Sequence, residues 1–334
     1  MLPPNPLFEY LVCPRCRHIE GSCVYAHPLR YTSAEALDCS NPHCNRRYPI
    51  IDGVVLLLAA HSTQLINPLL WSNETREAAL GADPALLELE TRLASYAWTA
   101  FHDHLALPGP KLELPVHLCE LLSWAEQLGA VEGSAATLSA GAALGREAWL
   151  AQHAPLVLLD AHLPSLLASR RLATEGCIEL FFPVEAGRFE RVRLELPHPP
   201  SAEQLWVCAD IHDPPFRAEA FSRVLAANLL DSVARPHIAL GQLLALAAPE
   251  GHLILSSPFT WRDEITESAL RFSAYPGVAS SLEGLCEDLA ALAPERSLLG
   301  QRDFLWALRM GARQLSLYQS VGLVLGSASS IAPL

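Results

Sequence analysis

The sequence has no uninterrupted apolar run of the roughly 18–20 residues that a membrane-spanning helix needs. The longest candidate, GVVLLLAAH at 53–61, is too short to cross a bilayer. The N-terminus, MLPPNPLFEY, also lacks a basic stretch followed by an apolar one, so no secretion signal is indicated. We therefore expect a cytoplasmic protein with no membrane segment, in which cysteines stay reduced.

Basic residues are also scarce. The chain of 334 residues has 23 Lys and Arg against 36 Asp and Glu, a formal charge of −13, so the molecule as a whole repels phosphate backbones. Arg15, Arg17, Arg46 and Arg47 form a local basic strip, but acids are interspersed with them, as on an ordinary solvated surface. A nucleic-acid substrate is thus disfavoured. The hydrophobic fraction of 51% is typical of a well-packed protein, and the length allows two domains.

Four cysteines stand in two close pairs. Cys13 and Cys16 form a C-x2-C pair, and Cys39 and Cys44 are separated by four residues. Tight turns of this kind present two thiolates on one side of the backbone, and two such turns complete a tetrahedral zinc site. Cys23 and His43 lie close enough in sequence to compete as ligands, although four thiolates suffice. The others with apolar neighbours are interpreted as small core residues: Cys119, Cys177, Cys208 and Cys286.

The segment 8–58 resembles the small zinc-ribbon family that activates transfer-RNA and translation-factor methyltransferases. The resemblance lies in LVCPRC, the second cysteine pair and the closing RRYPIIDGVVLLL, with Val55 where the family usually has proline. It implies a structural zinc and a protein partner that binds through the ribbon. Because such ribbons also occur fused ahead of methyltransferases, we expect a ribbon at 1–60, a helical linker or lid at 61–114 and a methyltransferase-like domain at 115–334.

Glycines mark a turn between two predicted strands. Residues 135–139 read as a short buried strand, GAALG at 141–145 as a turn, 146–153 as a helix and 155–162 as a strand that contains Asp160. Small residues let the backbone approach a ligand at the mouth of a sheet, and a carboxylate after the next strand can accept hydrogen bonds from ribose hydroxyls. Taken alone, the G-x-A-x-G pattern is weak evidence for a ligand-binding turn.

Strands and helices alternate along most of the chain. Helices are predicted at 83–105, 115–129, 236–251 and 280–293; a hairpin is predicted at 177–196, and strands at 205–210, 221–228, 252–261, 303–310 and 316–326. This alternation predicts an α/β fold with a doubly wound, mostly parallel, seven-stranded Rossmann-like sheet and an antiparallel edge. His102 and His104 are interpreted as surface or hinge residues, since their two-residue spacing separates them on a helix.

Residues 115–326 resemble class I S-adenosylmethionine-dependent methyltransferases. The matching pieces are LSAGAALGRE, Asp160, ADIHDPPF, FSRVLAANLLDSV and PEGHLILSSPFTW. The resemblance implies S-adenosylmethionine binding by a set of residues spread over four strand ends: Gly141, Ala143, Gly145, Asp160, Asp210, Ile211 and Asn228, the last near the methionine end. Two positions depart from the pattern. Ser139 stands where an acid usually precedes the glycine turn, and Ser222 replaces a common aspartate.

Methyl transfer from a sulfonium needs positioning and exclusion of water more than covalent help, so no compulsory catalytic residue is expected. Four residues are candidates near the mouth, each with an ordinary structural role as the alternative: Asp231, His237, Phe259 and Trp261. The sequence thus favours a methyltransferase acting on a small-molecule or protein acceptor. The alternative is a catalytically degenerate methyltransferase fold that serves as a binding or scaffold subunit through its ribbon.

Overall fold

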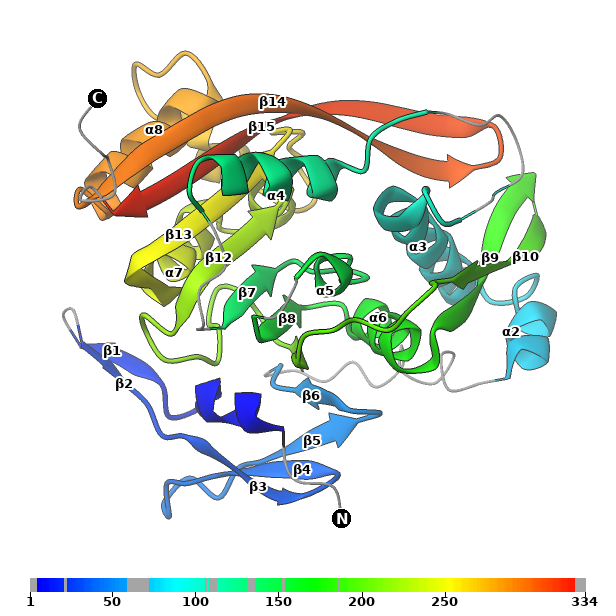
Figure 1. Ribbon diagram of the computed structural model, residues 1–334, viewed down its shortest axis with the longest axis horizontal. Helices are drawn as coiled ribbons and strands as arrows, with labels where there is room; N and C mark the ends of the chain where they lie inside the picture. Colours follow the sequence, from blue (N-terminus) through cyan, green and yellow to red (C-terminus); the bar gives the residue numbers. More distant parts are fainter. Residues whose placement is uncertain are drawn as a thin grey trace.

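A computed structural model describes residues 5–20, 23–58, 72–105, 107, 113–130, 136–151, 154–185 and 187–327 of the chain. Across these ranges, none of the helices combines the length and the apolar character that crossing a membrane requires. Short N-terminal strands lead through a helical segment into alternating strands and helices, and a long hairpin ends the described chain (Figure 1).

A mostly parallel sheet forms the centre of the molecule. Its seven main strands are β7 (Thr137–Ala140), β8 (Leu156–Asp160), β11 (Gln204–Cys208), β12 (Phe221–Ala227), β13 (Ala247–Ser257), β14 (Arg296–Gly311) and β15 (Gln314–Ser327). Their order across the sheet is β14-β15-β13-β12-β7-β8-β11. Neighbours from β13 to β11 pair in parallel, whereas β15 is antiparallel to both β13 and β14. The predicted doubly wound, mostly parallel Rossmann-like sheet with an antiparallel edge is therefore confirmed.

The direction in which the chain builds the sheet reverses at β7. Strands β8 and β11 extend the sheet to one side of β7, and β12 and β13 extend it to the other. In open sheets of this kind, ligands bind outside the carboxyl ends of the strands at the point of reversal. The topology therefore places a candidate site at the carboxyl ends of β7, β8 and β12.

Helices cover both faces of the sheet. They are α2 (Asn73–Ala79), α3 (Pro84–Phe101), α4 (His117–Gln127), α5 (Glu147–Leu150), α6 (Leu163–Glu175), α7 (Pro236–Leu246) and α8 (Ser281–Leu292). Side chains alternate along the strands. Leu138 and Val157 accordingly pack on the face that carries α7 and α8, while Leu156 and Leu158 pack on the face that carries α3, α6 and the hairpin of β9 (Cys177–Glu185) and β10 (Arg188–Glu195).

The N-terminal segment joins this sheet directly. It contains η1 (Pro6–Tyr10), β1 (His18–Glu20), β2 (Cys23–Tyr25), β3 (Leu29–Ser33), β4 (Ala36–Cys39), β5 (Arg47–Ile51) and β6 (Val54–Leu56). Strand β6 pairs in parallel with β11, and β5, β4 and β3 follow, so the described sheet has eleven strands rather than seven. The sheet thus runs without interruption from its seven main strands into the N-terminal strands.

The ribbon also covers the connection between β11 and β12. Residues 209–220, all of which are described, contain no helix. Instead, Leu11 forms a bridge with Phe216, and the Val12 N–H donates to the Pro215 carbonyl at 2.9 Å. Leu7 and Leu11 are buried in the same core cluster as Val207 and Val224. The ribbon therefore closes the face of the sheet beside α7, where a crossover helix would otherwise lie.

Several predicted boundaries were wrong. The helix predicted at 146–153 is the single turn α5, because Pro155 opposes helical backbone before it and β8 begins at Leu156. The helix predicted at 236–251 ends at Leu246, since Pro249 cannot continue it. The final strands are longer than predicted. Of the cysteines expected in the core, Cys208 is buried, whereas Cys119, Cys177 and Cys286 are half-buried. Residues 61–71, 106 and 108–112 of the predicted linker lie outside the described residues.

Candidate functional site

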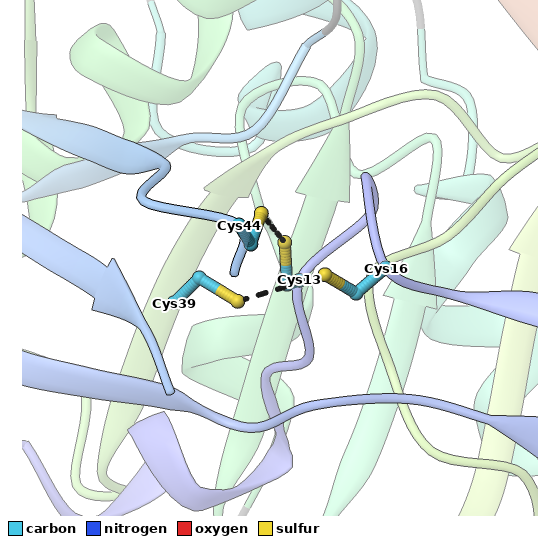
Figure 2. Close-up of side chains that lie close together, drawn as sticks. All are labelled: Cys13, Cys16, Cys39 and Cys44. Atoms are coloured by element: carbon cyan, nitrogen blue, oxygen red, sulfur yellow. Dashed lines mark hydrogen bonds between the residues drawn. The ribbon is translucent and has the colours of Figure 1, made fainter. Parts of the chain in front are cut away.

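Two turns bring four cysteines together in the ribbon. After Cys13 the chain folds back sharply, because the N–H groups of Cys16 and Arg17 donate to the Cys13 carbonyl at 3.1 and 3.0 Å. A second turn places Cys44 beside Cys39, with the Cys44 N–H donating to the Asn41 carbonyl at 3.1 Å. Figure 2 shows the four side chains converging from these two segments. The structure thus brings the two cysteine pairs together in one cluster.

The sulfur atoms fit a tetrahedral metal site. The Cys13 and Cys44 Sγ atoms are 3.8 Å apart, as are those of Cys16 and Cys39, and all four lie within 4.8 Å of one another. Zinc–thiolate bonds of about 2.3 Å in a tetrahedron place their sulfurs about 3.8 Å apart. This cluster therefore has the donor set and dimensions that Zn²⁺ requires. His43 lies outside it and is exposed, and the Cys23 side chain lies outside the described residues.

Polar groups around the cysteines support thiolates. The Tyr48 hydroxyl lies 3.1 Å from the Cys13 Sγ. Asn41 donates its backbone N–H to Cys39 and its side-chain amide to Cys16, each at 3.4 Å. Hydrogen bonds of this kind to metal-ligating thiolates orient the thiolates and disperse their negative charge.

Arg17 connects the turn of Cys13 and Cys16 to the sheet. Its guanidinium donates to Asp213 and to the Gln242 side chain, both at 2.8 Å, and its side chain is 4% exposed. Asp213 belongs to the loop that follows β11, and Gln242 lies on α7. The turn of Cys13 and Cys16 is thereby tied to the loop that contains Asp210.

The glycine turn follows β7 and is held by Asp160. The N–H groups of Gly141 and Ala142 donate to the Leu159 carbonyl at 2.8 and 3.0 Å. The Ala143 N–H donates to Asp160 Oδ2 at 2.8 Å, and the His162 N–H donates to Oδ1 at 2.8 Å. The structure thus brings the predicted turn and the predicted carboxylate into direct contact.

Asp160 retains capacity for a ligand. A carboxylate offers about four acceptor positions, and the backbone N–H groups of Ala143, His162 and Ala161 do not use all of them. Burial raises the pKa of Asp160, and this is opposed by the backbone hydrogen bonds and by the positive charge of Arg92 on α3. The effect of Arg92 indicates that α3 lies near this edge of the sheet.

The two glycines of the turn differ in their surroundings. Gly141 (φ +73°) and Gly145 (φ +69°) both have left-handed backbone, which favours glycine. A Cβ on Gly145 would lie 2.6 Å from the Ser169 Oγ of α6 and 3.3 Å from Leu158, whereas one on Gly141 would meet the Leu229 side chain at 3.0 Å. Gly145 is therefore required for packing of the turn on α6, while Gly141 is limited mainly by a movable side-chain end.

The loop after β11 contains Asp210 and Ile211. The carboxylate of Asp210 is exposed and accepts hydrogen bonds from the His212 N–H at 2.9 Å and the His212 ring at 2.7 Å. The hydrogen bond from the His212 ring is the main cause of the lowered pKa of Asp210, which burial opposes. Ile211 is 7% exposed and packs in the core cluster beneath the loop.

Left-handed backbone gathers at the carboxyl edge. Ala143, Asn228 and Phe259 have φ values of +48°, +53° and +50° and follow β7, β12 and β13. Backbone strain at non-glycine residues often marks functional edges. The side-chain oxygen of Asn228 accepts from Ser256 at 3.1 Å and Ser320 at 2.8 Å, so this group ties β12 to β13 and β15.

The candidate residues near the mouth have structural partners. Asp231 is buried and accepts from the Thr260 N–H and hydroxyl at 2.9 and 3.1 Å. His237 is hydrogen-bonded to Asp288 of α8 and contacts Tyr275. The Trp261 indole donates to Ser281 at 2.9 Å, and Phe259 packs near Trp261. These contacts hold the segment after β13 against α7 and α8.

Glu147 is a candidate that the sequence analysis missed. It is the first residue of α5, is 6% exposed, and accepts a hydrogen bond from the Ser139 hydroxyl. A carboxylate therefore lies beside the position where Ser139 replaces the usual acid. The sequence carried a weak signal, an acid two residues after the last glycine of the turn. Ser222, the second departure, lies in β12, and its N–H donates to the Ala136 carbonyl at 3.1 Å.

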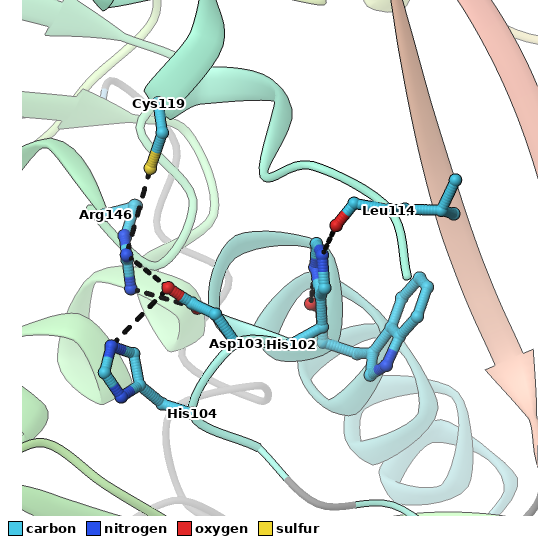
Figure 3. Close-up of polar contacts among 7 residues, drawn as sticks. His102, Asp103, His104, Leu114, Cys119 and Arg146 are labelled. Atoms are coloured by element: carbon cyan, nitrogen blue, oxygen red, sulfur yellow. Dashed lines mark hydrogen bonds and ion pairs between the residues drawn. The ribbon is translucent and has the colours of Figure 1, made fainter. Parts of the chain in front are cut away.

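Arg146 links the glycine turn to the helical segment. Its guanidinium donates to the two Asp103 oxygens at 3.3 and 2.7 Å and to the Cys119 Sγ at 3.8 Å, as Figure 3 shows. His104 lies 3.5 Å from Asp103, whereas the His102 ring contacts the Leu114 carbonyl at 2.7 Å. Thus the end of α3 and the start of α4 are fastened to the residue that follows Gly145.

No family model matches the sequence, and no curated protein matches it. Among solved structures, the chain is similar to a putative methyltransferase from Bacillus halodurans C-125, with 12% identity, 63% of this chain and 97% of that chain covered, and a TM-score of 0.42. The N-methyltransferase NodS from Bradyrhizobium japonicum WM9 is 16% identical, with 63% of this chain and 93% of that chain covered and a TM-score of 0.38. Magnesium protoporphyrin IX methyltransferase from Synechocystis PCC 6803 with bound SAM is 12% identical, with 72% of this chain and 97% of that chain covered and a TM-score of 0.39. These likenesses are distant, and the fold assignment rests on the strand order described above.

Proposed function

We propose that this chain is an S-adenosylmethionine-dependent methyltransferase with a structural zinc ribbon. The observation that carries the proposal is the contact between the glycine turn and Asp160 at the point where the sheet reverses. Backbone that can approach a ligand and a carboxylate with free acceptor positions occur there together. This is the pair of groups that an adenosyl ligand requires.

The residues present fit the adenosyl group. Asp160 would accept hydrogen bonds from the ribose hydroxyls through its remaining acceptor capacity. Gly141 and Ala143 would lie against the ligand through backbone atoms, with Gly145 packing the turn on α6. Asp210 and Ile211, after the neighbouring strand β11, would contact the adenine, and Asn228 would lie near the methionine end.

The bound cofactor would supply an activated methyl group. The chain's own residues would bind and orient the reactants and keep water out, which is the main requirement of an in-line displacement. The Arg146–Asp103 contact supports this role, because it fastens α3 to the glycine turn beside the site. His237 and Asp231 are held by structural partners, so we assign no catalytic role to either.

We infer that the acceptor is a small molecule or a protein. The net charge of −13 disfavours nucleic acid. We also propose that the ribbon at 1–60 binds Zn²⁺ for folding and offers a surface to a protein partner. We also propose a cytoplasmic location, in which the ribbon thiols would stay reduced and available to the metal.

Calorimetric titration of the intact protein with S-adenosylmethionine tests the proposal. We expect saturable binding and, with a panel of small-molecule and protein acceptors, transfer of label from the methyl group. The scaffold alternative would be favoured if the protein binds S-adenosylmethionine but transfers no methyl group to any acceptor, and if its ribbon captures a protein partner. Failure to bind at millimolar concentrations would contradict the methyltransferase assignment.

A further inference from the structure

Glu147 is a buried carboxyl group with an incomplete set of partners. Its Oε1 accepts a hydrogen bond from the Ser139 hydroxyl, whereas Oε2 is buried and has no hydrogen-bond partner among the described residues. Within the described part of the chain, no Lys, Arg or His nitrogen forms an ion pair with Glu147. The neighbouring Arg146 is directed instead to Asp103 and Cys119.

Such an arrangement is unfavourable for the protein alone. Buried ionised groups are normally paired, and a buried acceptor without a partner costs free energy. Burial raises the pKa of Glu147 to about 7, the Ser139 hydrogen bond opposes this, and the negative charge of Asp160 raises it further. Among the described residues, no cation acts to lower the pKa of Glu147.

Glu147 stands where a ligand group could supply that cation. It begins α5 two residues after Gly145, and its partner Ser139 lies in β7 two residues before Gly141. The electrostatic effect of Asp160 shows that both acids lie near the same edge of the sheet. Two acids at this edge favour a ligand with a positively charged end.

We propose that Glu147 binds the α-ammonium group of S-adenosylmethionine through its free carboxyl oxygen, in place of the acid that is missing at Ser139. The inference rests on the proposed function. The ammonium would provide both the hydrogen-bond donor and the countercharge that Oε2 lacks. Ser139 would keep a role, because its hydroxyl fixes the other oxygen of the carboxylate.

Binding of an ammonium would favour the ionised form of Glu147. The described groups that act on it are Ser139 on β7, its own backbone N–H and Asp160 at the end of β8; the adjacent Arg146 is directed to Asp103, just after α3, and to Cys119 on α4. Burial raises the pKa of the Cys119 thiol, so it remains neutral in this range. Binding near neutral pH would therefore release a proton from Glu147, and affinity would rise as pH increases towards about 7.

The test compares S-adenosylmethionine with 5′-methylthioadenosine, which lacks the amino-acid end. Calorimetry is carried out on the wild type, on Glu147→Gln and on Glu126→Gln, a change at an exposed acid of α4. We expect Glu147→Gln to weaken S-adenosylmethionine binding about 10- to 100-fold, as for loss of a charge-assisted hydrogen bond, and to change methylthioadenosine binding less than about twofold. Glu126→Gln should change neither.

The wild type provides a second measurement that needs no variant. Its affinity for S-adenosylmethionine should rise about tenfold between about pH 5.5 and about pH 7, with proton release, and that for methylthioadenosine should stay constant. If the wild type binds both ligands and Glu147→Gln weakens both equally or neither, the ammonium assignment is wrong while the proposed function stands. If the wild type binds neither ligand, both are wrong.

Discussion

Replacement of Gly145 by alanine tests whether the glycine turn is built for packing, for a ligand, or for both. Its backbone is left-handed, and a Cβ would lie 2.6 Å from the Ser169 Oγ and 3.3 Å from Leu158. Ser169 cannot move freely, because its Oγ accepts a hydrogen bond from the Trp206 indole at 3.1 Å and its side chain is buried. The added methyl group therefore has no space unless α6 shifts.

The expected loss of stability has two parts. Left-handed backbone costs a non-glycine residue about 1–2 kcal/mol. Overpacking a well-filled core costs about 1–3 kcal/mol more. Gly145→Ala should therefore lower the free energy of unfolding by about 2–5 kcal/mol. Gly176→Ala is the matched control, since Gly176 has φ +76° at the end of α6 and nothing within 4 Å of its Cβ position. Gly176→Ala should lower the free energy of unfolding only by the cost of the left-handed backbone, about 1–2 kcal/mol.

Urea unfolding at neutral pH, followed by far-ultraviolet circular dichroism, measures both variants. Gly141→Ala is included because its Cβ would meet only the movable end of Leu229, at 3.0 Å. It should resemble Gly176→Ala in stability but weaken S-adenosylmethionine binding. Equal losses in Gly145→Ala and Gly176→Ala, within about 0.5 kcal/mol, would refute the packing role of Gly145. Unchanged cofactor binding in Gly141→Ala would refute the ligand role of that glycine.

Three further predictions follow from the two sites and one buried histidine. Cys39→Ser should lose bound zinc and unfold at a lower temperature, since a small ribbon draws folding free energy from its metal; full zinc content by metal analysis would contradict the site. Asp160→Ala should weaken S-adenosylmethionine binding by about 1.5–3 kcal/mol in titrations, and unchanged affinity would remove its role. Burial lowers the pKa of His117 from 6.5 to about 4. The unfolded chain then binds the proton first, so stability should fall as pH drops from about 6.5 to about 4, by about 3 kcal/mol in total, and His117→Gln should lessen this loss in urea titrations.

The fold class could be predicted because its signals are local. Alternating strands and helices require crossovers, and crossovers of this length favour parallel strands. Two consecutive strands at the end of the chain indicated the antiparallel edge formed by β14 and β15. Boundaries were less predictable, as at Leu246, where the apolar pattern continues past the point at which Pro249 stops the helix.

The two candidate sites differed in how far the sequence could define them. Cys13, Cys16, Cys39 and Cys44 were identified by spacing alone, because each pair lies within one tight turn and the thiolate chemistry needs nothing else. The glycine turn and Asp160 followed from strand order, since parallel neighbours end at the same edge. Glu147 could not be identified in this way, because its significance depends on burial and on a missing countercharge.

Tertiary structure alone decided how the parts join. The sequence determined a ribbon, a glycine turn and a strand-end carboxylate, each through short-range geometry. It did not determine that β6 would pair with β11, that Gly145 would pack on Ser169, or that Glu147 would be buried beside Ser139. These contacts join segments that are distant along the chain or that lie on different elements. Their energies depend on which surfaces exclude water together, which local sequence patterns do not specify.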